Sequence, residues 1–226
     1  MTGSADAPRT TILAIDSATT RVIVAVGTLT GELIDATEWP AGYRHGETLL
    51  PTIAALLERL ELTPASVAAI VVGTGPGAFT GLRVGIATAK GLAHGLGRPI
   101  VGVPTGVALL AAAGGQAALL IPAGPSDRVL IRAGEPSRLL PGGSEPELHP
   151  GETLIAFDLD GRAPAEALER GQLARDGLAA ALLRLGAGRL EATGGDDLEA
   201  LVPDYVTLPR GVTATTGEVA WSHDLR

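Results

Sequence analysis

The amino-acid sequence predicts an α/β protein in which helices pack on a mixed sheet. Three closely spaced apolar runs near the N-terminus are typical of an antiparallel meander of strands. Strand-like and helical patterns then alternate, which favours parallel strands with helices between them. The chain is 46% hydrophobic but only 3% aromatic, so its core must consist of Ala, Val, Leu and Ile. At roughly 25 cal/mol per Å² of buried apolar surface, these side chains suffice for a globular fold.

The first three strands are expected at residues 11–15, 21–26 and 31–36, where apolar runs are separated by short polar turns. Residues 45–48 are expected to lead into a helix at residues 49–60, because leucine and isoleucine recur there at helical spacing and form a broad apolar face. Pro51 is expected in the first turn of this helix, where a missing N–H group is tolerated.

Strands at residues 67–72 and 100–103 flank a helix at residues 82–96 in the next part of the chain. A further helix is expected at residues 104–113, with the pair Gly114-Gly115 as its stop. Three antiparallel strands followed by parallel ones are the ribonuclease-H-like pattern.

The second half of the chain has weaker patterns. We expect strands at 118–121, 128–131 and 153–157, a loop with an edge strand at 133–151, and a helix at 163–185 that breaks near Gly177. Residues 202–226 have little periodicity. The sequence therefore predicts two lobes, an N-terminal ribonuclease-H-like lobe at 1–114 and a degenerate C-terminal lobe at 115–226, whose tail can pack back on the first lobe.

Charge and composition exclude several classes of protein. A net charge of −8 argues against a general nucleic-acid-binding surface, although the arginines allow a local basic patch and Lys90 is the only lysine. Cysteine is absent, which excludes disulfides and thiolate chemistry. No run approaches the roughly 20 apolar residues of a membrane span, and residues 1–10 are too polar for a secretory segment. We therefore expect a cytoplasmic protein with no membrane partner.

A glycine-rich segment at residues 73–85 joins a strand to a helix, an arrangement that often binds anions or nucleotides. It formally fits a dinucleotide fingerprint, but that fingerprint needs an acid roughly 20 residues further on. No acid occurs between Leu62 and Ser126, and Pro76 removes an N–H group from the loop. We interpret the segment as a tight strand-to-helix turn with Thr80 as N-cap, which still allows a weak anion site.

The turn at residues 16–20 follows the first strand, and in actin-like phosphotransferases such a turn holds phosphate and metal. The alternative is a hairpin turn formed by Asp and Ser. Catalysis would need further carboxylates on neighbouring strand ends, and the first half offers none after Glu61. Together with the glycine-rich segment, this turn supplies the expected vestigial nucleotide-binding residues, Asp16, Ser17, Thr19, Gly75 and Gly77.

Small residues recur every four positions on the helix that follows the glycine-rich segment and form one ridge, Gly81, Gly85, Ala89 and Ala93. A glycine inside a helix costs about 1 kcal/mol relative to alanine, so close approach of another segment should compensate. Two alternatives remain open for this ridge. It packs within the chain, or it meets a helix of another subunit, with the apolar helix beside it widening the patch.

Residues 157–161, Phe-Asp-Leu-Asp-Gly, match the strand-end motif of haloacid-dehalogenase-like phosphatases. Those enzymes also need a downstream lysine, and none follows Lys90. We interpret this segment as a strand followed by an exposed turn. No metal site is expected, because no metal-ligand spacing joins the four histidines, His45, His94, His149 and His223.

Several segments resemble the TsaB (YeaZ) family, namely residues 13–17, 45–57, 75–86 and 90–93. The most specific part is the Gly-Pro-Gly-x-Phe-Thr-Gly-x-Arg signature, which begins at Gly75. The resemblance covers residues 11–110, and residues 202–206, Val-Pro-Asp-Tyr-Val, are similar to the family's C-terminal Pro-x-Tyr segment.

This resemblance implies a two-lobed actin-like ATPase fold whose own catalytic site has decayed. It implies a partner subunit, not an enzyme and without a cofactor, that supports a TsaD-like catalytic subunit. That subunit forms threonylcarbamoyladenosine at position 37 of tRNAs that read codons starting with A. TsaE, an ATPase, joins the complex, TsaC supplies threonylcarbamoyl-adenylate, and the chain meets tRNA only indirectly. The alternative is an active nucleotide-dependent phosphotransferase or hydrolase of the same fold, and a dehydrogenase is a third class.

The resemblance also implies that the first two helices, at residues 45–60 and 80–96, form the interface with the partner. The same surface allows a self-dimer when the partner is absent. The expected interface residues are Leu49, Leu50, Ile53, Leu57, Gly81, Val84, Gly85, Thr88, Ala89, Gly91 and Leu92. Two departures exist: Ala78 stands where the family usually has Ser, and residues 121–129 replace an Asp-Ala-Arg-like stretch, which leaves the role of the second lobe open.

Overall fold

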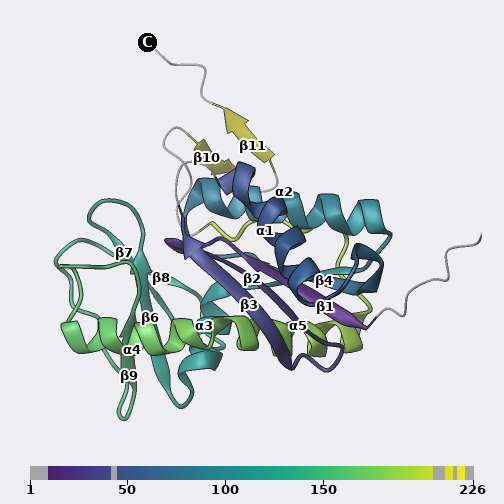
Figure 1. The fold of residues 1–226 in the computed structure, drawn as a ribbon. Helices are drawn as coiled ribbons and strands as arrows, with labels where there is room; N and C mark the ends of the chain where they lie inside the picture. Colours follow the sequence, from purple (N-terminus) through teal and green to yellow (C-terminus); the bar gives the residue numbers. More distant parts are fainter. Residues whose placement is uncertain (1–9, 42–44, 206–211, 216–217, 222–226) are drawn as a thin grey trace, which may run out of the picture.

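The structure is a computed structural model and describes residues 10–41, 45–205, 212–215 and 218–221. Its first half forms a five-stranded sheet with three helices (Figure 1). These elements are β1 (Thr11–Asp16), β2 (Arg21–Thr28), β3 (Leu33–Pro40), α1 (His45–Arg59), a 3-10 turn (Pro64–Ser66), β4 (Val67–Gly73), α2 (Phe79–Leu96), β5 (Ile100–Val103) and α3 (Thr105–Ala113).

The strand order of the first sheet is β3-β2-β1-β4-β5. The pairs β1–β2 and β2–β3 are antiparallel, whereas β4 is parallel to β1 and β5 is parallel to β4. Antiparallel strands followed by parallel ones were predicted from the sequence, and the structure confirms this order.

The second half forms a four-stranded sheet of order β8-β7-β6-β9, in which β6 and β9 are parallel. Its elements are β6 (Ala117–Pro122), β7 (Arg128–Ile131), β8 (Arg138–Leu140), β9 (Thr153–Ala156), α4 (Ala165–Asp176) and α5 (Leu178–Thr193). The break predicted near Gly177 is present, because that residue separates the two helices. The second helix continues beyond the predicted end.

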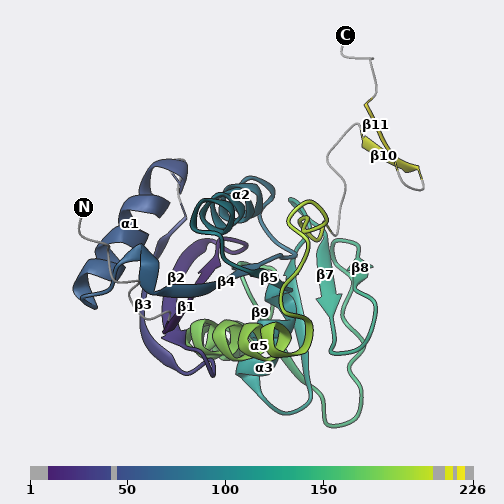
Figure 2. The ribbon, with the colours of Figure 1, turned by 90° about the vertical axis from the view of Figure 1, so that its right-hand side faces the viewer.

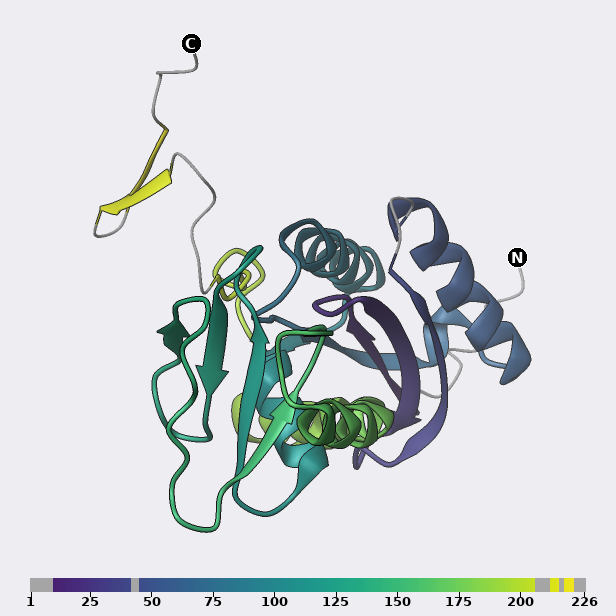
Figure 3. The ribbon, with the colours of Figure 1, turned by 90° about the vertical axis from the view of Figure 1, so that its left-hand side faces the viewer.

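The first sheet lies between two helical layers, which Figure 3 shows in end view. Helices α1 and α2 cover one face, where Leu13 and Ile15 of β1 are buried. Helix α5 covers the other face, where Ile12 and Ala14 are buried. This alternation follows from the two-residue period of a strand.

One apolar core joins the two sheets, because α5 comes from the second half of the chain but packs on the first sheet. Helix α3 contacts both α4 and α5, and Figure 2 shows it beside α5. Leu109 of α3, Leu183 of α5 and Ile121 of β6 belong to the same buried cluster. The relative position of the two sheets is therefore fixed by continuous packing.

Three predicted local features differ in the structure. Helix α1 begins at His45, so Pro51 lies inside the helix and not in its first turn. Helix α2 begins at Phe79 with Ala78 as N-cap, so Thr80 lies within the first helical turn. The last part of the chain, where little periodicity was expected, contains the antiparallel pair β10 (Val212–Thr215) and β11 (Glu218–Trp221).

Within the described residues, no helix combines the length and the apolar character that a membrane span requires.

Candidate functional site

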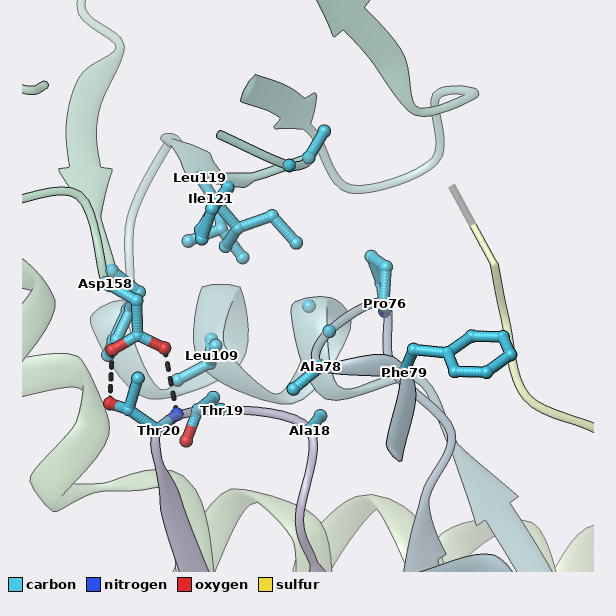
Figure 4. A pocket seen from close by; sticks show the side chains of 16 residues that line it. Ala18, Thr19, Thr20, Pro76, Ala78, Phe79, Leu109, Leu119, Ile121 and Asp158 are labelled. Carbon is cyan, nitrogen blue, oxygen red and sulfur yellow. Dashed lines mark hydrogen bonds between the residues drawn. The ribbon is translucent and has the colours of Figure 1, made fainter. Parts of the chain in front are cut away.

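A cavity of about 460 Å³ lies between the two sheets, and we call it the inter-sheet cavity. Its walls come from the turn after β1, the glycine-rich segment, α3, β6 and the end of β9 (Figure 4). Cavities of this size commonly hold small ligands. The lining residues are Ala18, Thr19, Thr20, Pro76, Gly77, Ala78, Phe79, Gly106, Leu109, Leu119, Ile121, Pro122, Ala123, Gly124, Phe157 and Asp158.

Asp158 is the one charged side chain among these lining residues, and it links the two halves of the chain. Thr20 donates two hydrogen bonds to its carboxylate, from the backbone N–H at 2.9 Å and from the hydroxyl at 2.5 Å (Figure 4). Asp158 has a φ of 54°, in the left-handed region that few residues with a Cβ adopt. The cavity is therefore apolar, with a single carboxylate that is already engaged.

Asp16, at the end of β1, is buried and is not one of the residues that line the cavity. Its carboxylate is completely buried and accepts hydrogen bonds from the Thr105 hydroxyl at 2.6 Å and from the Ala18 N–H at 3.0 Å. Burial raises the pKa of Asp16 to about 6, although both hydrogen bonds act in the opposite direction. A Cβ on Gly73 would lie 1.7 Å from this carboxylate, so only glycine fits beside it.

The other predicted nucleotide-binding residues are divided between the cavity and the packed interior. Thr19 and Gly77 line the cavity. Ser17 is buried under α2 and donates a hydrogen bond of 2.8 Å to the Gly81 carbonyl. Gly75, which has a φ of 100° and precedes Pro76 through a cis peptide bond, is not a lining residue.

The hydrogen-bond donors of the turn after β1 are largely satisfied by the chain itself. The Ala18 N–H donates to Asp16, the Thr20 N–H to Asp158, and the Arg21 N–H to the Thr19 hydroxyl. A bound phosphate at this turn would have to displace one of these acceptors. In the part of the chain that the structure describes, no group of three or more His, Cys, Asp or Glu side chains could hold a metal ion.

Comparison with curated proteins finds relatives that match part of the chain. A family model described as TsaD, tRNA N6-adenosine threonylcarbamoyltransferase, matches residues 40–145. An uncharacterized protein of Mycobacterium tuberculosis is 41% identical over 107 residues, which are 47% of this chain and 49% of that protein. The tRNA threonylcarbamoyladenosine biosynthesis protein TsaB of Escherichia coli is 37% identical over 97 residues, which are 42% of this chain and 40% of that protein. The chain thus spans about half the length, or less, of the curated relatives it matches.

The solved structure of YeaZ from Pseudomonas aeruginosa superposes with a TM-score of 0.67 and 24% identity, over 87% of this chain and 100% of that one. These similarities support the predicted resemblance to the TsaB (YeaZ) family. The superposition also confirms the predicted fold class, an actin-like or ribonuclease-H-like α/β fold with two mixed sheets flanked by helices. A second structure, described as an uncharacterized protein with similarity to peptidase YeaZ from Pseudomonas aeruginosa, has a TM-score of 0.65 at 25% identity over 88% of this chain and 100% of that one.

Two residues of the TsaB signature hold the segment that follows α5. The guanidinium of Arg83 stacks 3.7 Å from the centre of the Phe79 ring, and its Nε donates a hydrogen bond of 2.7 Å to the Tyr205 hydroxyl. The Asp204 N–H donates to the Thr74 carbonyl at 2.8 Å, so this segment crosses the glycine-rich segment. The Pro-x-Tyr segment therefore packs within the chain, against residues of the Gly-Pro-Gly-x-Phe-Thr-Gly-x-Arg signature.

The small-residue ridge of the TsaB-like helix α2 packs inside the chain. Gly81, Gly85, Ala89 and Ala93 are all buried. A Cβ on Gly85 would lie 2.1 Å from the Ser17 hydroxyl, and one on Gly81 would lie 2.3 Å from the Ser17 carbonyl oxygen. Of the two alternatives for this ridge, the structure therefore shows the first, in which the ridge packs within the chain.

The eleven predicted interface residues therefore fall into two groups. Six are buried within the chain: Leu49, Ile53, Leu57, Gly81, Gly85 and Ala89. Five carry exposed surface: Leu50, Val84, Thr88, Gly91 and Leu92. Val84, Thr88 and Leu92 are four residues apart, so they lie along one partly exposed stripe of α2, and Val84 and Leu92 also pack against the core.

Asp158 is the site residue that sequence reasoning missed. Its motif was interpreted as a strand followed by an exposed turn, but Asp158 is half-buried and the next residue, Leu159, is fully buried. Thr20 and Asp158 lie 138 positions apart, and neither carries a signal that points to the other. The one available clue was the Asp-x-Asp-Gly turn itself, at the end of a strand.

Proposed function

We propose that this chain is a non-catalytic partner subunit in the threonylcarbamoylation of adenosine 37 in tRNAs that read codons starting with A. In this proposal it binds and supports a TsaD-like catalytic subunit. A TsaE-like ATPase joins through the complex, and tRNA is met only indirectly. The observation that carries the proposal is the combination of TsaB-named relatives with an inter-sheet cavity that has one charged side chain among its described lining residues, an already engaged carboxylate.

The chemistry of the cavity supports a non-catalytic role. Nucleotide-dependent phosphoryl transfer relies on metal ions and cationic or backbone donors aimed at the phosphates. Here the turn after β1 donates to Asp158 and Asp16, and the cavity walls are mostly apolar. Asp16 is committed to a buried contact with Thr105.

The outer surface of α2 supports a role in binding a partner. Gly91 and Gly95 are exposed within the helix, and a Cβ at either position would meet no atom within 4 Å. Packing within the chain therefore gives no reason for these two glycines, although each costs the helix about 1 kcal/mol. They adjoin the stripe of Val84, Thr88 and Leu92. We propose that these glycines and the stripe together form the surface that binds the partner.

The test is co-purification with the TsaD-like subunit of the same organism, followed by a tRNA modification assay with purified components. Gly91→Arg adds a large charged side chain where the structure has open space, so the monomer should fold normally. We expect it to weaken association by at least about tenfold and to lower tRNA modification in parallel. Gly85→Leu and Ala89→Arg are unsuitable probes, because both positions are buried.

Gly188→Arg is the matched control, because Gly188 is an exposed glycine inside α5 whose Cβ would also meet no atom within 4 Å. It should bind the TsaD-like subunit as the unaltered chain does. Equal binding by both variants and the unaltered chain would refute the proposed surface. Full tRNA modification without this chain would refute the proposed function.

The second candidate function is an active nucleotide-dependent phosphotransferase or hydrolase. The raised pKa of Asp16 favours it, since strongly perturbed carboxyl groups often occur in active sites. This alternative requires ATP turnover by the purified chain that is lost in Asp16→Ala. Absence of both turnover and Mg-ATP binding at millimolar nucleotide would eliminate it.

A further inference from the structure

The contact between Thr20 and Asp158 has the form of an occupied oxyanion site. We propose that Asp158 is an internal anion: its carboxylate fills an oxyanion site formed by Thr20 in the turn after β1, and inorganic phosphate takes its place when Asp158 is removed. The contact then acts as a latch that closes the inter-sheet cavity to anions. This inference does not depend on the partner or on the tRNA reaction.

Two donors of one residue converge on the two oxygens of this carboxylate. The Thr20 N–H reaches one oxygen at 2.9 Å, and the Thr20 hydroxyl reaches the other at 2.5 Å. Hydrogen bonds to a charged acceptor are shorter and stronger than neutral ones. Phosphate offers the same kind of charged oxygen acceptor, so the two Thr20 donors can bind it in the same way.

The backbone at Asp158 indicates that the carboxylate is held in this position at some cost. Its φ of 54° is unfavourable for a residue with a Cβ, and asparagine and glycine tolerate that region better. Asp158→Gly and Asp158→Asn therefore remove the negative charge without adding backbone strain. Any effect of these variants can be assigned to the lost carboxylate.

The surroundings would accept an external anion once Asp158 is gone. The contact borders the inter-sheet cavity of about 460 Å³, so there is room for phosphate beside Thr20. The Arg162 guanidinium lies 3.4 Å from the Asp158 carbonyl oxygen, and its other hydrogen bonds go to the carbonyls of Gly124 and Pro125. Among the described residues no carboxylate pairs with Arg162, so its charge is available to favour an anion nearby.

The experiment measures binding of inorganic phosphate to the full chain by calorimetry and amide exchange at Thr20 by NMR. In the unaltered chain the Thr20 N–H should be protected from exchange although Thr20 is exposed, and phosphate should change nothing. In Asp158→Gly the protection should be lost and then restored by phosphate, with binding at least about tenfold tighter than in the unaltered chain. Adding Thr20→Val, which removes the hydroxyl donor, should weaken that binding again.

Asp160→Asn is the matched control, because it removes the same charge from an exposed residue of the same turn. It should leave Thr20 protected and phosphate unbound. Phosphate binding by Asp158→Gly that is no tighter than by Asp160→Asn would overturn the proposal, as would a Thr20 N–H that exchanges equally fast in every variant. If Asp158→Gly does not fold, Asp158→Asn should still bind phosphate more tightly than Asp160→Asn does, although its amide oxygen can accept from the Thr20 N–H, and equal binding by the two would overturn the proposal.

Discussion

The Thr105 hydroxyl donates a hydrogen bond of 2.6 Å to the Asp16 carboxylate and thereby ties the end of β1 to the first turn of α3. The same hydroxyl accepts the Gly75 N–H at 3.1 Å, so the glycine-rich segment joins this network. The acid that looks like a nucleotide-site residue in the sequence is thus a buried junction between three segments. Its burial has a consequence for the stability of the fold at different pH values.

Asp16 should make stability depend on pH between about 4 and about 6. Its pKa rises from an ordinary 3.8 to about 6 in the fold, so in this window the folded chain binds a proton more readily than the unfolded chain does. The contribution of Asp16 to stability is therefore greatest at low pH and falls as pH rises to about 6. Across the window the change should be on the order of 3 kcal/mol.

Urea unfolding of the unaltered chain and of Asp16→Asn at several pH values measures this effect. The free energy of unfolding of the variant relative to the unaltered chain should rise between pH 4 and 6 and stay level above pH 7. A difference that is constant over the whole range would contradict the raised pKa of Asp16.

The first sheet could be predicted from the sequence because its signals are local. The apolar runs of β1, β4 and β5 are continuous, and β4 is buried on both faces. The segment that packs against the small-residue ridge of α2 could not be predicted, because the pattern is the same whether the ridge contacts Ser17 or another subunit. The Thr20–Asp158 contact could not be predicted either, because it depends on the placement of one sheet relative to the other.

Two glycines of α2 should respond to the same substitution in opposite directions. Gly91→Ala should raise the free energy of unfolding by about 0.5–1 kcal/mol, because its Cβ meets open space and alanine favours a helix. Gly85→Ala should lower it by about 1–3 kcal/mol, because its Cβ would lie 2.1 Å from the Ser17 hydroxyl. Thermal and urea unfolding of both variants test this pair, and effects of equal sign would refute the packing described for α2.

Tyr205→Phe should loosen the segment after α5 without unfolding the protein. It removes the hydroxyl that accepts the Arg83 Nε–H but keeps the ring, whose centre lies 5.3 Å from that of Phe79. The expected loss is about 1 kcal/mol, confined to this segment. Amide exchange reports it, since the Asp204 N–H that donates to Thr74 should exchange faster. Tyr205→Ala should have a larger effect, and unchanged exchange in both variants would show that the contact does not hold the segment.

Two ion pairs that differ in exposure should contribute differently to the free energy of unfolding. Arg132 binds both oxygens of Glu152, at 2.6 and 2.8 Å, and the two side chains are only 11% and 6% exposed. The hydrogen bond from Arg132 holds the pKa of Glu152 below its ordinary range. Arg59 and Asp35 form a comparable pair at 2.7 Å, but their side chains are 50% and 33% exposed.

Glu152→Gln should therefore lower the free energy of unfolding by about 2 kcal/mol, since it leaves a poorly solvated guanidinium without its counter-charge. Asp35→Asn should cost less than about 1 kcal/mol, because water screens the exposed pair. The contribution of Glu152 should be present above its ordinary pKa and be lost as pH falls through the lowered value, so Glu152→Gln should approach the unaltered chain in strong acid. Urea unfolding at neutral and acid pH measures both variants, and equal losses at neutral pH would show that burial does not set the value of these pairs.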